Sequence, residues 1–162
     1  MSINSLSIAN AVLDEAERQG VSVTPMQLQK LVYFTNGWHM EIYNGQSIIS
    51  DSFEAWQFGP VMPAIYHEFK RFGSRNISGR AINIFNGEAW KADIQPAKAT
   101  LIQEVVGLYG KLSGPRMSHL THKEGTPWSK TWRGGVGSGN DIPNELILAE
   151  FKRIRNESTK AT

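Results

Sequence analysis

Two histidines in the C-terminal half are the clearest candidates for chemistry in this sequence. His119 and His122 are three residues apart, a spacing that puts both imidazoles on one face of a helix, where they could hold a metal ion. A zinc site needs a third protein ligand, but His39 and His67 fall in other predicted helices and there is no HExxH motif. We therefore predict no metal site and interpret His119 and His122 as a capping or hydrogen-bonding pair.

Ser118, His122 and Glu124 have the residue types of the nucleophile, the base and the orienting acid of a hydrolase. Such groups usually come together from distant parts of a chain, and the sequence has no GxSxG motif. It also contains no cysteine, which excludes thiol nucleophiles and cysteine-ligated metal centres. We predict that the protein is not an enzyme and that it uses no cofactor.

The glycine-rich segment 134–140 (GGVGSGN) is the remaining candidate for small-molecule chemistry, as a phosphate cradle. A phosphate-binding loop of this kind follows an apolar strand and is followed by Lys-Ser or Lys-Thr. Neither feature is present here. We predict a solvated, mobile loop instead.

Hydrophobic periodicity predicts that helices carry most of this chain. Helices are expected over residues 5–19, 24–43, 61–72 and 97–112, in a short piece over 116–123, and in a last helix from about 141 or 143. The second begins at a capping box, Thr24-Pro25-Met26-Gln27, and its apolar residues go most of the way round the cylinder. It is therefore the predicted central helix, and Gly37 in its interior predicts a close approach by another element.

Short strands are expected within 47–58, over 81–85 and around 89–91, where apolar residues lose the helical period and Asn-Gly pairs mark turns. The predicted fold class is α+β, a mostly helical single domain around a central buried helix with a small antiparallel sheet. A length of 162 residues suits one domain. We place it at residues 1–156 and expect residues 157–162 to be a flexible C-terminal tail.

Composition and charge narrow the possible partners. No stretch approaches 18 apolar residues and the N-terminal segment is unlike a secretory signal, so we expect a cytoplasmic protein without a membrane partner. The net charge is +2, carried by the segment from Glu150 onward, so no basic stripe for nucleic acid is visible. The two helices over 5–43 could still form a helix-turn-helix, but the second offers mainly Gln27, Gln29 and Lys30 to a DNA groove before it turns apolar.

Aromatic residues near turns indicate a different kind of surface. Trp56, Trp128 and Trp132 lie beside predicted turns and loops, and Met62 and Tyr66 belong to a neighbourhood rich in residues that are enriched at protein interfaces. These side chains could form an exposed protein-binding surface or belong to the core. Trp38, in the central helix, is assigned to the core.

Three stretches together resemble the Panacea domain of phage-associated GepA-like proteins and SocA-like antitoxins. They are Leu28-Gln29-Lys30-Leu31-Val32-Tyr33-Phe34; Phe53 to Val61 (FEAWQFGPV) with Ile65, Tyr66 and Phe69; and Leu120-Thr121-His122 followed by Pro127-Trp128. The match in order and spacing covers roughly residues 5–132. From Trp132 onward no similarity helps.

The resemblance implies a mostly helical α+β antitoxin that neutralises a cognate protein toxin by direct contact, the toxin being encoded by the adjacent gene. Two alternatives stay open: a proteolytic adaptor that delivers the toxin to a cellular protease, and a helix-turn-helix-like DNA-binding regulator. The expected protein-binding residues are Trp56, Phe58, Met62, Tyr66, His122, Trp128 and Trp132. The resemblance implies no catalytic residue.

Overall fold

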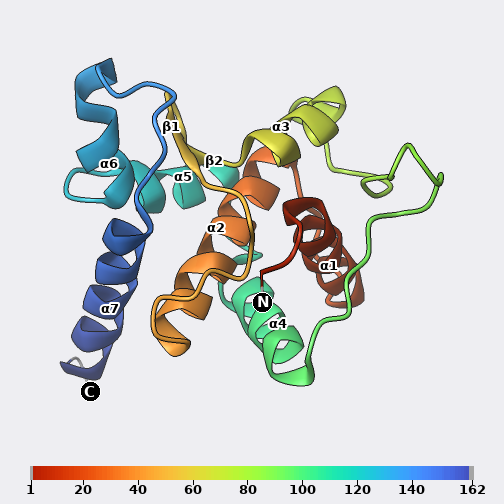
Figure 1. Ribbon diagram of the computed structural model, residues 1–162, viewed down its shortest axis with the longest axis horizontal. Coiled ribbons are helices and arrows are strands. Elements are labelled where there is room, and N and C mark those ends of the chain that lie inside the picture. Colours follow the sequence, from red (N-terminus) through yellow and green to blue (C-terminus); the bar gives the residue numbers. More distant parts are fainter. Residues whose placement is uncertain (1, 161–162) are drawn as a thin grey trace.

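The computed structural model describes residues 2–160 of the chain as one helical domain with a small sheet (Figure 1). The α-helices are α1 (Ser5–Arg18), α2 (Pro25–Ile42), α3 (Pro63–Phe69), α4 (Pro96–Tyr109), α5 (Gly114–His122), α6 (Pro127–Trp132) and α7 (Asn144–Lys160). The strands β1 (Glu54–Trp56) and β2 (Gly59–Val61) form an antiparallel hairpin, and the short 3-10 helices are η1 (Lys70–Phe72) and η2 (Arg133–Gly135). This is the predicted fold class.

Helix α2 lies at the centre of the domain, as predicted, and contacts α1, α3, α4, α5, α7 and β2. Its start is the predicted capping box: Thr24 Oγ1 accepts the Gln27 N–H at 3.3 Å, and Gln27 Oε1 accepts the Thr24 N–H at 2.9 Å. The expected close approach at Gly37 is made by α7, because a Cβ built on Gly37 would lie 2.1 Å from Cε2 of Phe151. The helix is thus packed on several sides.

The predictions for the first helix and for the C-terminal tail have different outcomes. Helix α1 confirms the predicted first helix almost residue for residue. The expected tail 157–162 lies partly outside the described residues, and its described part, 157–160, continues helix α7. No helix within residues 2–160 combines the length and the apolar character that crossing a membrane requires.

Two helix boundaries in the second half differ from the predictions, the end of the fourth helix, expected at 112, and the start of the next, expected at 116. Gly114-Pro115 was expected to end the fourth helix, but α4 ends at Tyr109 and Gly114-Pro115 opens α5. The physical reason is that Ser113 caps α5 by accepting the Arg116 N–H at 3.2 Å, and a proline fits the first turn of a helix because its missing N–H is not needed there.

The strands expected over 81–85 and around 89–91 do not form. The structure has an isolated bridge between Ile82 and Ala89 and a turn between them, so the sheet of the described residues remains the β1–β2 hairpin. A strand pair here would bury little apolar surface beyond its base, because Ile84 and Phe85 at the tip of the turn are almost fully exposed. The segment between η1 and α4 is a long loop that projects from the domain (Figure 1).

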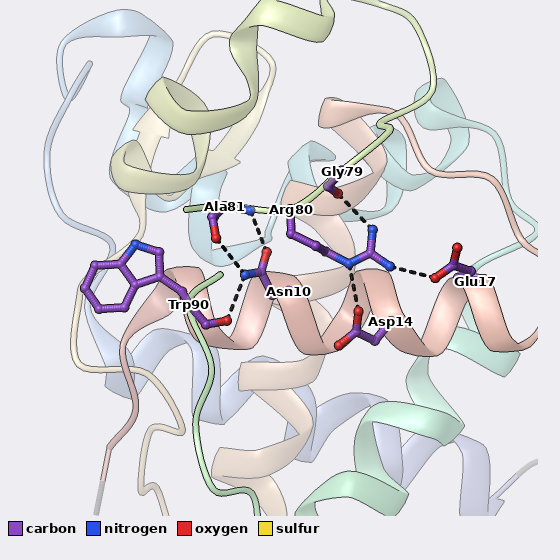
Figure 2. Close-up of polar contacts among 7 residues, drawn as sticks. All are labelled: Asn10, Asp14, Glu17, Gly79, Arg80, Ala81 and Trp90. Atoms are coloured by element: carbon purple, nitrogen blue, oxygen red, sulfur yellow. Dashed lines mark hydrogen bonds and ion pairs between the residues drawn. The ribbon is translucent and has the colours of Figure 1, made fainter. Parts of the chain in front are cut away.

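This loop is fastened to α1 by one buried amide, that of Asn10 (Figure 2). Its Nδ2 donates to the carbonyl oxygens of Ala81 at 3.0 Å and Trp90 at 2.8 Å, and its Oδ1 accepts the Ala81 N–H at 2.8 Å. Beside it, Arg80 forms ion pairs with Asp14 and Glu17, both largely exposed, which contribute little stability. The Asn10 side chain is therefore the main polar attachment of the loop base.

Replacing Asn10 with alanine is expected to lower the free energy of unfolding by about 2 kcal/mol, because it leaves buried loop groups without partners. Chemical denaturation measures this change, and hydrogen exchange should show faster exchange of the Ala81 amide. Asn76→Ala, in the exposed part of the same loop, is the matched control and should change stability by less than about 0.5 kcal/mol. Equal stability of the Asn10 variant and the wild type would contradict this assignment.

Candidate protein-binding site

The hairpin β1–β2 is the structural centre of the candidate site. Glu54 pairs with Val61 and Trp56 with Gly59, so Gln57 and Phe58 form a two-residue turn. Gly59 has φ of 122°, a conformation that strongly favours glycine, and a Cβ there would lie 2.9 Å from the Lys30 Nζ. Short strands were expected within 47–58, so the second strand, which begins at Gly59, lies beyond the predicted range.

Side chains of α2 hold the second strand. The amide of Gln29 accepts the Met62 N–H at 2.8 Å and donates to the Met62 carbonyl at 3.0 Å, as a neighbouring strand would. The adjacent Lys30 donates from Nζ to the Pro60 carbonyl at 3.1 Å. The two polar residues of the first matched stretch thus fix the position of the hairpin against the core.

Helices α5 and α6 hold the turn from the other side. Ser118 Oγ donates to the Phe58 carbonyl at 2.7 Å, and Trp128 Nε1 donates to the Trp56 carbonyl at 2.6 Å. The Trp128 contact joins the third matched stretch to the second. The three stretches that are far apart in the sequence therefore meet at one rigid hairpin.

The glycine-rich segment is mostly exposed, as expected of a solvated loop, but its backbone is also hydrogen-bonded to the hairpin, which was not expected. The Gly139 N–H donates to the Ala55 carbonyl at 2.8 Å, and the Ala55 N–H donates to the Asn140 carbonyl at 2.9 Å. Gly137 is buried, and a Cβ there would lie 1.7 Å from the Thr131 carbonyl oxygen. Small residues are needed in this segment because the backbone itself lies against β1 and α6.

An aromatic pocket opens between the hairpin, α2 and α3. It has a volume of about 460 Å³, and the side chains that shape it include Met26, Trp56, Phe58, Ile65 and Tyr66. The exposed fraction is 64% for Phe58 and 41% for Tyr66, so large apolar groups face solvent at its rim. The rings of Trp56 and Tyr66 meet edge to face, with 4.9 Å between their centroids. We call this feature the aromatic pocket.

The structure divides the seven predicted protein-binding residues into three groups. Trp56, Phe58 and Tyr66 line the aromatic pocket together. Met62 has an exposed fraction of 0%, so it packs in the core and offers no surface to a partner, contrary to expectation. His122, Trp128 and Trp132 form a separate aromatic stack that supports the hairpin from behind.

Several residues of the aromatic pocket were not predicted from the sequence, among them Met26 and Lys70. Met26, one of the apolar residues of the predicted central helix, is partly exposed at the start of α2 and lines the pocket. Lys70 follows Tyr66 by four residues and lines the same pocket. The spacing of four residues puts two side chains on one face of a helix, so this signal could have identified Lys70.

Ser118 and His122, which were considered for catalysis, form hydrogen bonds with each other and with the backbone. His122 Nδ1 lies 3.1 Å from Ser118 Oγ and also contacts the Ser118 carbonyl, which fits the predicted hydrogen-bonding pair for His122. Ser118 Oγ donates to the Phe58 carbonyl, and the contact of His122 Nδ1 with the Ser118 carbonyl requires an N–H on that nitrogen, so this nitrogen does not act as a base for Ser118. Within residues 2–160, no three histidine, aspartate or glutamate side chains gather as a metal site would require.

Helix α2 also lacks the free polar face that a helix needs in order to contact bases in the major groove of DNA. Its polar candidates for base contacts are engaged internally: Gln27 in the capping box, Gln29 with Met62 and Lys30 with Pro60. The helix itself is enclosed by its neighbours. A recognition helix must enter the major groove with its polar residues exposed, which α2 in this arrangement cannot do.

Lys30 is the buried charge of the site, with an exposed fraction of 2%. Within residues 2–160 no carboxylate forms an ion pair with it. Burial lowers the pKa of its ammonium group to about 8, because the charged form loses hydration. The lysine therefore destabilises the folded state whenever it is fully protonated.

This gives a stability prediction with a definite sign. Because the folded pKa of about 8 lies below the usual value of 10.5, the unfolded chain binds more protons between these values and stability rises with pH. We expect a gain of about 2 kcal/mol from pH 7 to 9.5 relative to Lys30→Met, measured by denaturant unfolding of both proteins. Parallel pH profiles of the two proteins would contradict the assignment.

The geometry defines the class of the protein: a small helical domain whose rigid hairpin presents an aromatic pocket suited to binding. The chain belongs to the family described as Antitoxin SocA-like, Panacea domain, whose model matches residues 28–129. Antitoxin SocA of Caulobacter vibrioides (strain NA1000 / CB15N) is 29% identical over 158 residues, which cover 93% of this chain and 84% of that protein. No solved structure matches the chain. The family resemblance drawn from the three stretches is confirmed.

Proposed function

We propose that this protein is the antitoxin of a toxin–antitoxin pair and neutralises its cognate toxin in the cytoplasm by direct contact through the aromatic pocket. Family membership and the name of the relative Antitoxin SocA support the antitoxin role. The exposed aromatic rim of the pocket supports the mode of action and is the observation that carries it. Exposed aromatic side chains around a concavity are typical of surfaces that contribute strongly to protein binding.

The hydrogen bonds of the hairpin add a physical argument for direct binding. Phe58 stands on a turn whose backbone is held by Ser118, and Trp56 on a strand held by Trp128. Binding to a preformed surface loses less conformational entropy than binding that must first order a loop. The pocket can therefore bind a protein without a large rearrangement of the domain.

Co-expression with the product of the neighbouring gene tests the proposal. That product should arrest growth alone, and this protein should restore growth and form a complex with it that survives gel filtration. Toxin lifetime should stay unchanged, because neutralisation by contact does not require degradation. A toxin whose half-life falls in the presence of this protein would favour delivery to a protease, and failure to restore growth would remove the antitoxin role.

A further inference from the structure

The charges that line the aromatic pocket have one sign. Its lining includes the side chains of Lys30 and Lys70 and no aspartate or glutamate. Within residues 2–160, neither lysine forms an ion pair, whereas the neighbouring Arg71 pairs with Glu68. Among the described residues, the pocket thus combines an apolar rim with two lysines that form no ion pair.

The two lysines occupy different depths. Lys30 comes from α2 and is buried beneath the hairpin, where its Nζ has one hydrogen bond, to the Pro60 carbonyl, although an ammonium group has three donors. Lys70 stands at the exposed junction of α3 and η1, one helical turn after Tyr66. A ligand group that enters between the aromatic rings therefore meets positive potential at the rim and at the base.

We propose that the aromatic pocket binds a toxin segment in which an apolar side chain is flanked by a carboxylate, the apolar group packing on Trp56, Phe58 and Tyr66 and the carboxylate facing Lys70. This inference rests on the proposed function, since it takes the occupant to be the toxin. Complementary charge at a partly desolvated apolar site adds specificity, because a neutral or basic segment would leave the lysines unpaired.

Two short peptides provide the direct test with the full-length protein. Both are N-acetylated and C-amidated; one contains Leu-Phe-Asp and the other Leu-Phe-Asn, so they differ only in charge. Titration is followed by NMR through the indole N–H of Trp56, which lies beside the pocket and donates to Glu54. The acidic peptide should bind at least about threefold more tightly at low salt, and this preference should shrink as salt screens the charges.

Matched charge variants assign the preference to the pocket. Lys70→Gln should abolish the preference for the acidic peptide, whereas Lys91→Gln, at an exposed lysine outside the pocket lining, should keep it. Equal affinity for both peptides, absence of a Trp56 shift with either, or an unchanged preference in Lys70→Gln would overturn the proposal. A second copy of this chain as the occupant would show itself as a dimer that Lys70→Gln dissociates, which would also overturn it.

The toxin experiment separates this inference from the proposed function. If the wild type neutralises the toxin and Lys70→Glu does so equally well, the carboxylate-binding role fails while the antitoxin role stands. If the wild type neither binds nor neutralises the toxin but retains the peptide preference, the antitoxin role fails and the pocket chemistry stands. The supporting result is at least tenfold weaker toxin binding by Lys70→Glu, with Lys91→Glu unchanged.

Discussion

A variant with Phe58→Ser and Tyr66→Ser should fold normally and fail to neutralise the toxin. Both side chains are substantially exposed, so their removal takes little apolar area out of the core. They line the same concavity from two elements, the hairpin turn and α3, so one partner group can be buried against both. Truncation of central aromatic anchors of this kind costs about 2 kcal/mol each, so removal of both should cost about 4 kcal/mol, an expected loss of about 1,000-fold in toxin affinity.

The control for this variant is Phe85→Ser. Phe85 is 92% exposed at the tip of the Asn83–Glu88 turn, so the same chemical change is made at an apolar side chain outside the pocket. Growth rescue and affinity should equal those of the wild type. Circular dichroism and thermal unfolding should be unchanged in both proteins. Loss of rescue in Phe85→Ser, with rescue retained in the double variant, would place the toxin contact on the projecting loop instead.

The parts of the fold that sequence reasoning identified are those determined by local chemistry. A capping box requires particular residues at fixed spacing, so Thr24 and Gln27 marked the start of α2. Apolar residues around a whole helix can be accommodated only by packing on several sides, so the central position of α2 followed from its pattern. Gly37 indicated a close neighbour, although the sequence could not name Phe151 as that neighbour.

The sequence predicted only part of the aromatic pocket, because the pocket depends on contacts between distant segments. Trp56, Phe58 and Tyr66 were among the predicted binding residues, and the structure brings them together. Met62 has similar chemistry but follows β2 directly, where the Gln29 amide draws its backbone into the core. Hydrophobic periodicity does not reveal a hydrogen bond between residues 33 positions apart, such as that between Gln29 and Met62.

The strands were the least predictable elements for a related reason. Strand β2 is three residues long and contains Gly59 and Pro60, which disfavour strands in general. It persists because Lys30 and Gln29 supply hydrogen bonds that a longer sheet would normally provide. The segment 81–91 has better local strand chemistry but covers the core only at its base, through Ala81 and Trp90, and it forms a turn fastened there by Asn10.

The largest loss of stability is expected from Gly37→Ala. A methyl group there would lie 2.1 to 2.5 Å from three atoms of the Phe151 ring, and that ring is itself buried in the core. Alanine favours a helix over glycine by about 1 kcal/mol, but overpacking a rigid core costs about 1 to 3 kcal/mol or more. Because the whole ring must move and α7 with it, we expect a net loss above about 3 kcal/mol, measured by denaturant unfolding.

Gly107→Ala is the matched control, since it makes the same change inside α4. A Cβ at Gly107 would meet its nearest neighbour, Gln19 Oε1, at 3.6 Å, an ordinary contact, so the helix propensity of alanine should stabilise the protein by up to about 1 kcal/mol. The two substitutions are therefore expected to have opposite signs. Destabilisation of similar size by both would show that the effect at Gly37 does not come from its contact.

A double-mutant cycle identifies the contact itself. Phe151→Leu removes the crowded edge of the ring and is destabilising alone, because it leaves a cavity between α2 and α7. In the double variant the new methyl group occupies part of that cavity, so the combined loss should fall short of the sum of the single losses by at least about 1 kcal/mol. Additive losses would mean that α7 does not pack on Gly37, and the central place of α2 in the fold would have to be revised.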